Sequence, residues 1–268
     1  MSNNLAIVLV ATNYYFSLGI RFINRWSYLY EGNLNVTFHF YSESDPSEYL
    51  DKNLSNVIFH KMTTKSWPEA DVSRIYEIIK LKNYNYDHIY IFDADTNIKN
   101  KFNDYLFKNN ITAYQHWCCE LFEKDSTTAS YFEYSDKDIW YQTCLLGGNA
   151  NSMIEMCEST LPWIDVDKQN NYTPHWIAEA YFNKYLHFNP PQYTILRNKK
   201  HPFIMSDKGN SNTEKSGADA RPFIDITDEY YNNILKNIKN NKSSFWDIKN
   251  NQFVIDSVDN IKRFENYV

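Results

Sequence analysis

The sequence has little cysteine and no excess of positive charge. Its 268 residues include four cysteines, and none of these forms the C-x-x-C pair typical of zinc or redox sites. Two of them, Cys118 and Cys119, are adjacent, and we expect reduced thiols rather than disulfides. The formal net charge of −6 argues against nucleic acid as a partner. An acidic protein that binds an anionic ligand needs a local solution, such as a metal ion.

Long apolar runs and targeting signals are also missing. The apolar run at residues 5–11 is too short to cross a bilayer, and it lacks the basic region and cleavage site of a signal peptide. We therefore expect no transmembrane segment and a cytoplasmic location, with peripheral contact to a membrane left open. The chain does have 43% hydrophobic residues, which are enough for a sizeable core.

Apolar runs alternate with helical patterns along the chain. Strands are expected at residues 5–11, 36–41, 57–60, 88–92 and 145–148, the last ending in a tight turn at Gly147-Gly148. Helices are expected at residues 14–30 and 66–81, from about residue 151, and from Thr173-Pro174 onward. Such alternation predicts an α/β fold with a mostly parallel central sheet flanked by helices.

The composition changes after residue 200. Residues 1–200 are expected to form the main domain, and residues 201–222 a mobile loop rich in small and charged residues. Residues 223–268 alternate polar and apolar positions and predict a helical C-terminal tail.

Two aspartates directly follow the expected strand at residues 88–92. In parallel sheets, ligands bind beyond the carboxyl ends of the strands, which is where Asp93 and Asp95 stand. Alternate carboxylates can hold a hard divalent cation and leave positions open for phosphate oxygens. A solvated turn is the alternative. Asp165 and Asp167 have the same spacing, but no strand precedes them, and we expect no metal site there.

Glu179 is a second candidate for chemistry. It lies among apolar and aromatic residues, and the expected helix places Trp176, Glu179 and Asn183 on one face. A carboxylate in such surroundings is costly unless it is paired or functional. An exposed helix glutamate is the alternative.

Several motifs, in the same order, resemble glycosyltransferase family 6, the group of the histo-blood-group A and B transferases and the α-1,3-galactosyltransferase. The segment "IYIFDAD" resembles the family's strand that ends in D-V-D. Trp67, Ser73, Arg74 and Ile78 resemble its W…S-x-R-x-x-x-I segment. Residues 122–148 and 166–185 resemble two further motifs, and the second places Asp167 on a lone aspartate outside the family's metal motif. The resemblance covers about residues 5–196.

This resemblance implies a GT-A type nucleotide-sugar-binding fold, with residues 1–200 as the catalytic domain. It also implies a UDP-sugar donor, Mn²⁺ (or Mg²⁺) as the cofactor, and transfer with retention at the anomeric carbon. The sugar would be galactose or N-acetylgalactosamine, joined by an α-1,3 bond to an oligosaccharide or glycolipid acceptor. A GT-A transferase for another nucleotide sugar, such as UDP-glucose, and a catalytically inactive sugar-binding module are the alternatives. Homo-oligomer formation is left open.

The resemblance also assigns roles to individual residues. The catalytic residue would be Glu179, and the metal ligands would be Asp93 and Asp95. The donor-binding residues would be Ala11, Thr12, Tyr15, Arg74, Asp93, Ala94, Cys144 and Gly147. The acceptor-binding residues would be His116, Gln142 and Trp176.

Departures from the family pattern concern both substrates. The family's S-P-E-Y-L-W-D motif is absent, and residues 196–209 stand in its place, which puts the acceptor in question. Ile177 and Ala178 replace the family's His-Asp before the catalytic glutamate, which puts the donor sugar in question. Cys144 is bulkier than the glycine or alanine usual at its position, which favours galactose over N-acetylgalactosamine. Residues 206–220, between basic neighbours, would form either a lid over the diphosphate or a passive linker.

Overall fold

The structure is a computed structural model. It describes residues 3–13, 15–51, 54, 56–63, 68–98, 101–115, 122–135, 137–195, 203–204, 242–247 and 252–257. The elements are β1 (Asn4–Val10), α1 (Tyr15–Leu29), β2 (Asn35–Ser42), β3 (Val57–Lys61), α2 (Glu69–Lys80), η1 (Leu81–Asn83), β4 (His88–Phe92), β5 (Asn97–Ile98), η2 (Asp104–Phe107), β6 (Ile111–Gln115), β7 (Tyr141–Asn149), α3 (Ala150–Gln169), α4 (Ala178–Phe188), β8 (Tyr193–Ile195), β9 (Phe203–Ile204), β10 (Lys242–Asp247) and β11 (Gln252–Ser257).

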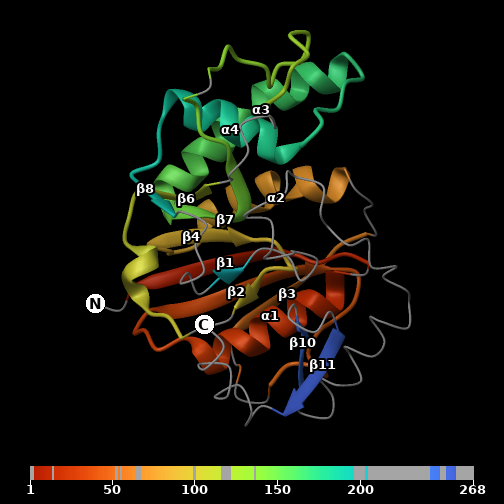
Figure 1. The fold of residues 1–268 in the computed structure, drawn as a ribbon, viewed down its shortest axis with the longest axis vertical. Helices are drawn as coiled ribbons and strands as arrows, with labels where there is room; N and C mark the ends of the chain where they lie inside the picture. The colour runs from red at the N-terminus through yellow and green to blue at the C-terminus, as the bar shows by residue number, and fades with distance from the viewer. Residues whose placement is uncertain are drawn as a thin grey trace.

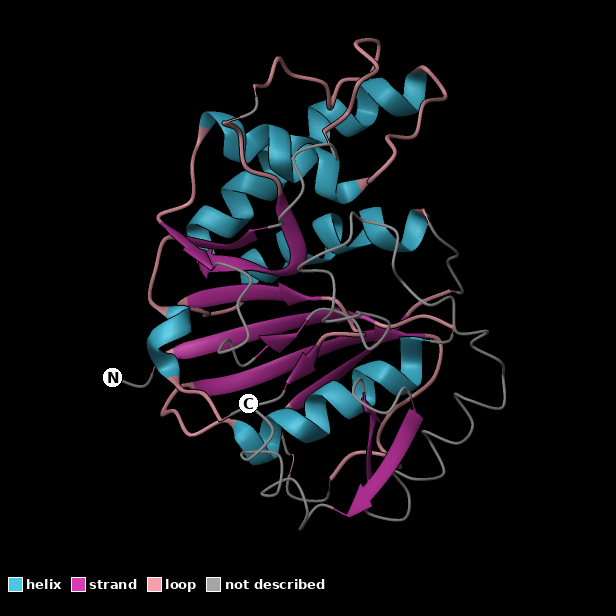
Figure 2. Ribbon diagram, viewed as in Figure 1, coloured by secondary structure: helices cyan, strands magenta, loops and turns pink. Residues whose placement is uncertain are grey.

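A seven-stranded sheet forms the centre of the molecule, in the order β3-β2-β1-β4-β7-β6-β8 (Figures 1 and 2). The pairings β1–β2, β2–β3, β1–β4 and β6–β8 are parallel. Strand β7 runs antiparallel to both of its neighbours, β4 and β6. The prediction of a mostly parallel α/β sheet is therefore confirmed, and the antiparallel β7 is a feature that the sequence patterns did not indicate.

Strand β1 is buried on both faces, as its continuous apolar run predicts. Leu5, Ile7 and Leu9 pack in the core layer that includes α1. Ala6 and Val8 pack in the other layer, which includes residues of α2, α3 and α4. Figure 1 shows α1 on one side of the sheet and α2, α3 and α4 on the other.

The pair Gly147-Gly148 lies inside β7 and does not form the expected tight turn. An added Cβ at Gly147 would stand 2.2 Å from the ring of Tyr90, and one at Gly148 would stand 1.8 Å from the backbone oxygen of Asn110. The glycines therefore let neighbouring groups approach the β7 backbone closely. Glycine pairs mark turns in many sequences, and here the same residues serve packing instead.

Two helices begin later than the sequence patterns predict. Helix α2 begins at Glu69, with Pro68 as its N-cap residue and no side-chain cap bond. Helix α4 begins at Ala178, several residues after Thr173-Pro174. Residues 175–177 form a turn, so Trp176 precedes the helix and does not share a helical face with Glu179.

The described part of the C-terminal tail contains strands where helices were expected. Strands β10 and β11 pair antiparallel, with Lys242 opposite Ser257 and Asp247 opposite Gln252. Their segments, "KSSFWD" and "QFVIDS", are rich in the aromatic and β-branched residues that favour strands. In the preceding region, β9 pairs with β5, and the expected lid at residues 206–220 lies outside the described residues. Across the described residues, every helix is too short or too polar to cross a bilayer.

The packing of Gly147 leads to a prediction about stability. Gly147→Ala should lower the free energy of unfolding by about 2–3 kcal/mol, because the new methyl group would overlap a buried ring. Tyr90 cannot turn away easily, since its hydroxyl donates to the Leu106 oxygen at 2.9 Å. Urea unfolding measures the change.

The matched control for this prediction is Gly32→Ala. The added methyl there meets the side-chain ends of Asp104 and Tyr30 in a partly buried loop, where a shift breaks side-chain hydrogen bonds but displaces no fully buried ring. A loss at Gly147 no larger than the loss at Gly32 would contradict the packing argument.

Candidate active site

The candidate site lies at the carboxyl ends of the parallel strands. Asp93 directly follows β4, and Ala11 directly follows β1, the parallel neighbour of β4. Phe92, the last residue of β4, pairs with Leu145 of the antiparallel β7, so the first residues of β7 come to the same edge. This edge is where ligands bind in open α/β sheets.

Arg74 of α2 joins two carboxylates at this edge. Its Nη1 lies 2.8 Å from Oδ1 of Asp93, and its Nη2 forms an ion pair with Oδ1 of Asp71. Burial lowers the pKa of Arg74, but the negative charges of Asp71 and Asp93 outweigh this effect and raise it. The guanidinium is therefore a permanent positive charge beside the first aspartate of the motif.

Glu179 lies in the first turn of α4. Its carboxylate points toward the start of β7 and toward Trp140, the residue that precedes this strand. Nε1 of Trp140 donates to its Oε1 at 2.7 Å, and Oγ1 of Thr143 donates to its Oε2 at 3.3 Å. Trp140 is itself almost fully buried. Two donors therefore fix the orientation of a carboxylate that is partly buried.

The electrostatics of Glu179 link it to the other carboxylates. The pKa of Glu179 is raised to about 8, and burial is the largest cause. The negative charges of Asp93 and Asp71 raise this pKa further, whereas the hydrogen bond from Trp140 and the positive charge of Arg74 lower it. Burial likewise raises the pKa of the Cys144 thiol well above its ordinary value, and Asp93, Glu179 and Asp95 raise it further. The structure thus brings Asp93, Asp95, Cys144 and Glu179 into one electrostatic group.

Asn183 attaches α4 to β7 and so carries Glu179 to the strand end. Its Oδ1 accepts from the backbone N–H of Tyr141 at 2.7 Å, and its Nδ2 donates to the Tyr141 oxygen at 2.8 Å. The same Nδ2 lies 2.8 Å from the backbone oxygen of Glu179. One amide side chain therefore continues the hydrogen bonding of the strand into the helix.

The predicted nucleotide-binding segment after β1 lies at the same edge. Ala11 is buried, and its oxygen accepts from the Ser42 hydroxyl at 2.8 Å. Thr12 is buried, whereas Tyr15, the first residue of α1, is 39% exposed. Ala94 is buried within the turn between the two aspartates.

The remaining predicted residues are more scattered. Gln142 is buried at the start of β7, and Trp176 packs against the aromatic cluster of Phe122, Phe132 and Trp140. Gly147 lies within the sheet opposite Tyr90, away from the strand end. His116 lies outside the described residues.

The sequence patterns did not indicate three contacts of the candidate residues. These are Asp71 with Arg74, and Trp140 and Thr143 with Glu179. Asp71 stands three residues before Arg74, a helical spacing that favours an ion pair, so a signal for it was present. Trp140 is 39 residues from Glu179, and no local pattern connects the two.

The donor set at the strand end suits a hard divalent cation. Within the described ranges, no group of three or more His, Cys, Asp or Glu side chains stands ready to hold a metal ion. Mg²⁺ and similar ions are commonly bound by one or two carboxylates together with water and substrate phosphates. Asp93 and Asp95 could supply such a partial set, with the remaining ligands coming from a diphosphate.

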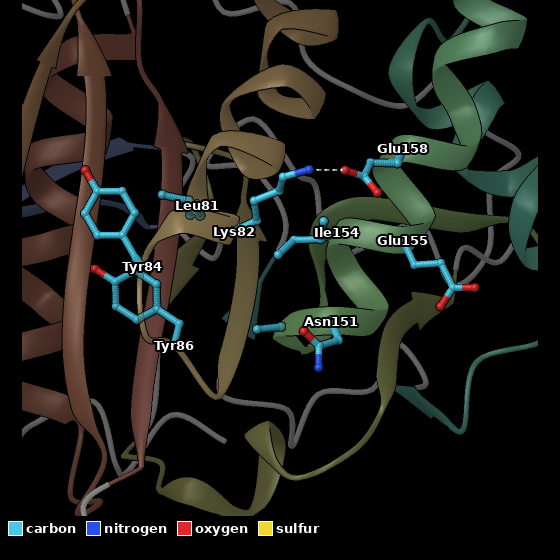
Figure 3. Close-up of a pocket in the computed structure, with 9 residues that line it drawn as sticks. Leu81, Lys82, Tyr84, Tyr86, Asn151, Ile154, Glu155 and Glu158 are labelled. Atoms are coloured by element: carbon cyan, nitrogen blue, oxygen red, sulfur yellow. Dashed lines mark hydrogen bonds and ion pairs between the residues drawn. The ribbon is translucent and has the colours of Figure 1, made fainter.

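A surface pocket of about 320 Å³ lies elsewhere, between η1 and α3 (Figure 3). Tyr84 and Tyr86, which line it, precede the first residue of β4, whereas the aspartate motif follows the last. Figure 3 shows Lys82 and Glu158 joined across its rim. The pocket is therefore distinct from the carboxylate site.

The raised pKa of Glu179 leads to a prediction for the metal-free protein. The folded chain keeps this proton up to about pH 8, while the unfolded chain releases it near the ordinary value of 4.5. The free energy of unfolding should therefore fall as the pH rises from about 5 to 8. Glu179→Gln should remove this effect, so the variant should gain about 2–4 kcal/mol relative to the parent over that interval.

Urea unfolding in EDTA at several pH values tests this prediction. Glu158→Gln, which changes an exposed ion pair, is the control and should show little change at any pH. A difference between the parent and Glu179→Gln that stays constant from pH 5 to pH 8 would show that Glu179 does not titrate in this way.

Comparison with known proteins accords with these features. No curated protein sequence matches the chain. The family model of glycosyltransferase family 6 matches residues 14–200, a span that includes Arg74, both aspartates of the motif and Glu179. Because this match covers more than half of the chain, the protein belongs to glycosyltransferase family 6.

Proposed function

We propose that this chain is a metal-dependent, retaining glycosyltransferase with a GT-A type fold. It would transfer galactose or N-acetylgalactosamine from the UDP-sugar to an oligosaccharide or glycolipid acceptor, forming an α-1,3 bond. The observation that carries the proposal is the carboxylate of Glu179, which Trp140 and Thr143 hold close enough to Asp93 for the two charges to interact. Membership of the family supports the general reaction.

On the donor side, Asp93 and Asp95 would hold Mn²⁺ or Mg²⁺. When bound, such an ion acts as a Lewis acid that stabilises the charge of a diphosphate leaving group. Arg74 orients Asp93 through the 2.8 Å ion pair. Its buried Nε has no hydrogen-bond partner among the described residues, and neither has Oε1 of Gln142. Buried polar atoms are normally satisfied, so both atoms are suitable contacts for a bound substrate.

Glu179 would act at the anomeric carbon, on the face opposite the leaving group. Its carboxylate can attack this carbon to form a glycosyl-enzyme, or it can stabilise an oxocarbenium ion while the acceptor enters from the side of the leaving group. Either role requires the ionised form. Since the charge of Asp93 helps to raise the pKa of Glu179, neutralising that charge on donor binding would favour ionisation.

Two positions would select the substrates. Cys144 is buried beside Thr143, so its thiol reduces the room for an N-acetyl group and favours galactose. Trp176 is partly buried against Phe122, Phe132 and Trp140, and its aromatic surface suits contact with an acceptor sugar.

The first test of this proposal concerns the metal. Asp95→Asn should weaken Mn²⁺ and UDP binding together, by about tenfold or more, because UDP binds an acidic strand end through the cation. Calorimetric titration with UDP, in Mn²⁺ and in EDTA, measures both effects. Asp165→Asn, which changes the exposed aspartate of the second D-x-D sequence, in α3, is the control and should bind as the parent does. Equal UDP affinity in Mn²⁺ and in EDTA would refute metal dependence.

The second test concerns the reaction. The parent should hydrolyse UDP-galactose slowly without an acceptor, and UDP-N-acetylgalactosamine and UDP-glucose more slowly. Glu179→Gln should lower kcat by about 10²–10⁴-fold and leave the Kd of UDP with Mn²⁺ within about threefold. Glu155→Gln, on the exposed face of α3, is the control. Unchanged kcat in Glu179→Gln would exclude the assigned role, and UDP binding without turnover of any donor would indicate a sugar-binding module.

A further inference from the structure

Helix α4 begins in a strained way and lacks a cap of its own. Its N-cap residue, Ile177, has φ 48° and ψ −115° and provides no side-chain cap bond. A positive φ is a genuine outlier for a β-branched residue, with a cost of about 1–3 kcal/mol. Ile177 is also buried, so the surrounding structure must hold this conformation in place.

Asp71 of α2 supplies the missing cap from another helix. Its Oδ2 accepts from the backbone N–H of Ala178, the first residue of α4, at 2.9 Å across 107 residues of sequence. A carboxylate at this point satisfies one of the free N–H groups of the helix and interacts favourably with the helix dipole. The side chain of Asp71 is 15% exposed, so solvent competes little for this bond.

The same carboxylate also holds the donor side of the site. Oδ1 of Asp71 pairs with Nη2 of Arg74, whose Nη1 contacts Asp93 at 2.8 Å. A continuous chain of polar contacts therefore runs from the backbone of α4, through Asp71 and Arg74, to the first aspartate after β4. The residue next to Ala178 is Glu179.

We propose that Asp71 is a positioning residue, which sets the distance and orientation of Glu179 relative to Asp93 by capping α4 and anchoring Arg74. The proposal rests on the function given above, in which these two carboxylates act on opposite sides of the donor sugar. Asp71 itself touches neither the sugar nor the ion in this account.

The electrostatics distinguish this role from simple stabilisation. Asp71, Asp93 and Glu179 all interact with the guanidinium of Arg74, and the carboxylates repel one another. A cap needed only for stability could be a neutral Ser, Thr or Asn, which serves a helix N-terminus equally well. A buried carboxylate that is paired with Arg74 connects α4 to Asp93, which a neutral cap would not do.

Substitutions of Asp71 in the full chain test the proposal. Asp71→Ala removes both contacts and should lower kcat for UDP-galactose hydrolysis by about 30–100-fold, because small misplacements of reacting groups cost about this much. The Kd of UDP with Mn²⁺ should change much less than kcat. Asp71→Asn retains an oxygen that can accept from Ala178 N–H but loses the ion pair with Arg74, so it should keep the cap and recover only part of kcat. Asp71→Glu keeps the charge but displaces it, and should be less active than Asp71→Asn.

The matched control is Asp104→Ala at the opposite end of the sheet. Oδ2 of Asp104 also accepts a distant backbone N–H, that of Asn33, at 3.0 Å. Its removal should lower the melting temperature and leave kcat of the folded protein within about twofold. If Asp71→Ala does not fold, the comparison of Asp71→Asn with Asp71→Glu still decides, and activity in the Glu variant equal to or above that of the Asn variant would overturn the proposal.

Amide hydrogen exchange gives a readout that does not depend on turnover. Residues 178–180 should exchange faster in Asp71→Ala than in the parent and near the parental rate in Asp71→Asn. Parental exchange and parental kcat in Asp71→Ala would each overturn the positioning role. Full activity of Glu179→Gln would instead overturn the proposed function, and the exchange rates would then still show whether Asp71 caps α4.

Discussion

The ion pairs of Arg74 hold together a site that is otherwise rich in negative charge. Its guanidinium contacts Asp71 and Asp93, and its charge also acts on Glu179. Carboxylates in a partly buried site repel one another and lose hydration. Without the guanidinium of Arg74, the free-energy cost of this repulsion and desolvation would not be compensated. Because α2 packs against the sheet, the guanidinium of Arg74 reaches the end of β4.

Strand β7 has an equally important role, because it lies between β4 and β6 and runs against both. Its antiparallel direction places the first residues of β7, rather than the last, at the edge where β4 ends. Thr143 therefore reaches Glu179, and the Tyr141 backbone is available to Asn183. The glycines farther along the strand allow the close packing against Tyr90 and Asn110 that this arrangement requires. The site thus depends on strand order as much as on individual side chains.

Patterns of burial explain which elements were predictable. Strands β1 and β4 have uninterrupted apolar runs, and the predicted bounds of residues 5–11 and 88–92 agree closely with Asn4–Val10 and His88–Phe92. The start of α4 was placed too early, because Thr173-Pro174 has the residue types of a helix start while the actual cap comes from Asp71 in another helix. The tail was predicted as helical from its alternation, yet its aromatic and β-branched segments form β10 and β11.

The sequence by itself determined the family, the α/β class and the location of Asp93 and Asp95 at a strand end, since each of these follows from residues that are neighbours in the chain. It also indicated Glu179, because a carboxylate among apolar residues is costly without a purpose. Only the tertiary structure decided which groups hold these side chains: Trp140 and Thr143 on Glu179, Arg74 on Asp93, and Asp71 on the first turn of α4. Such contacts join residues tens of positions apart. They arise from strand order and helix packing, which the periodicity of a single segment does not encode.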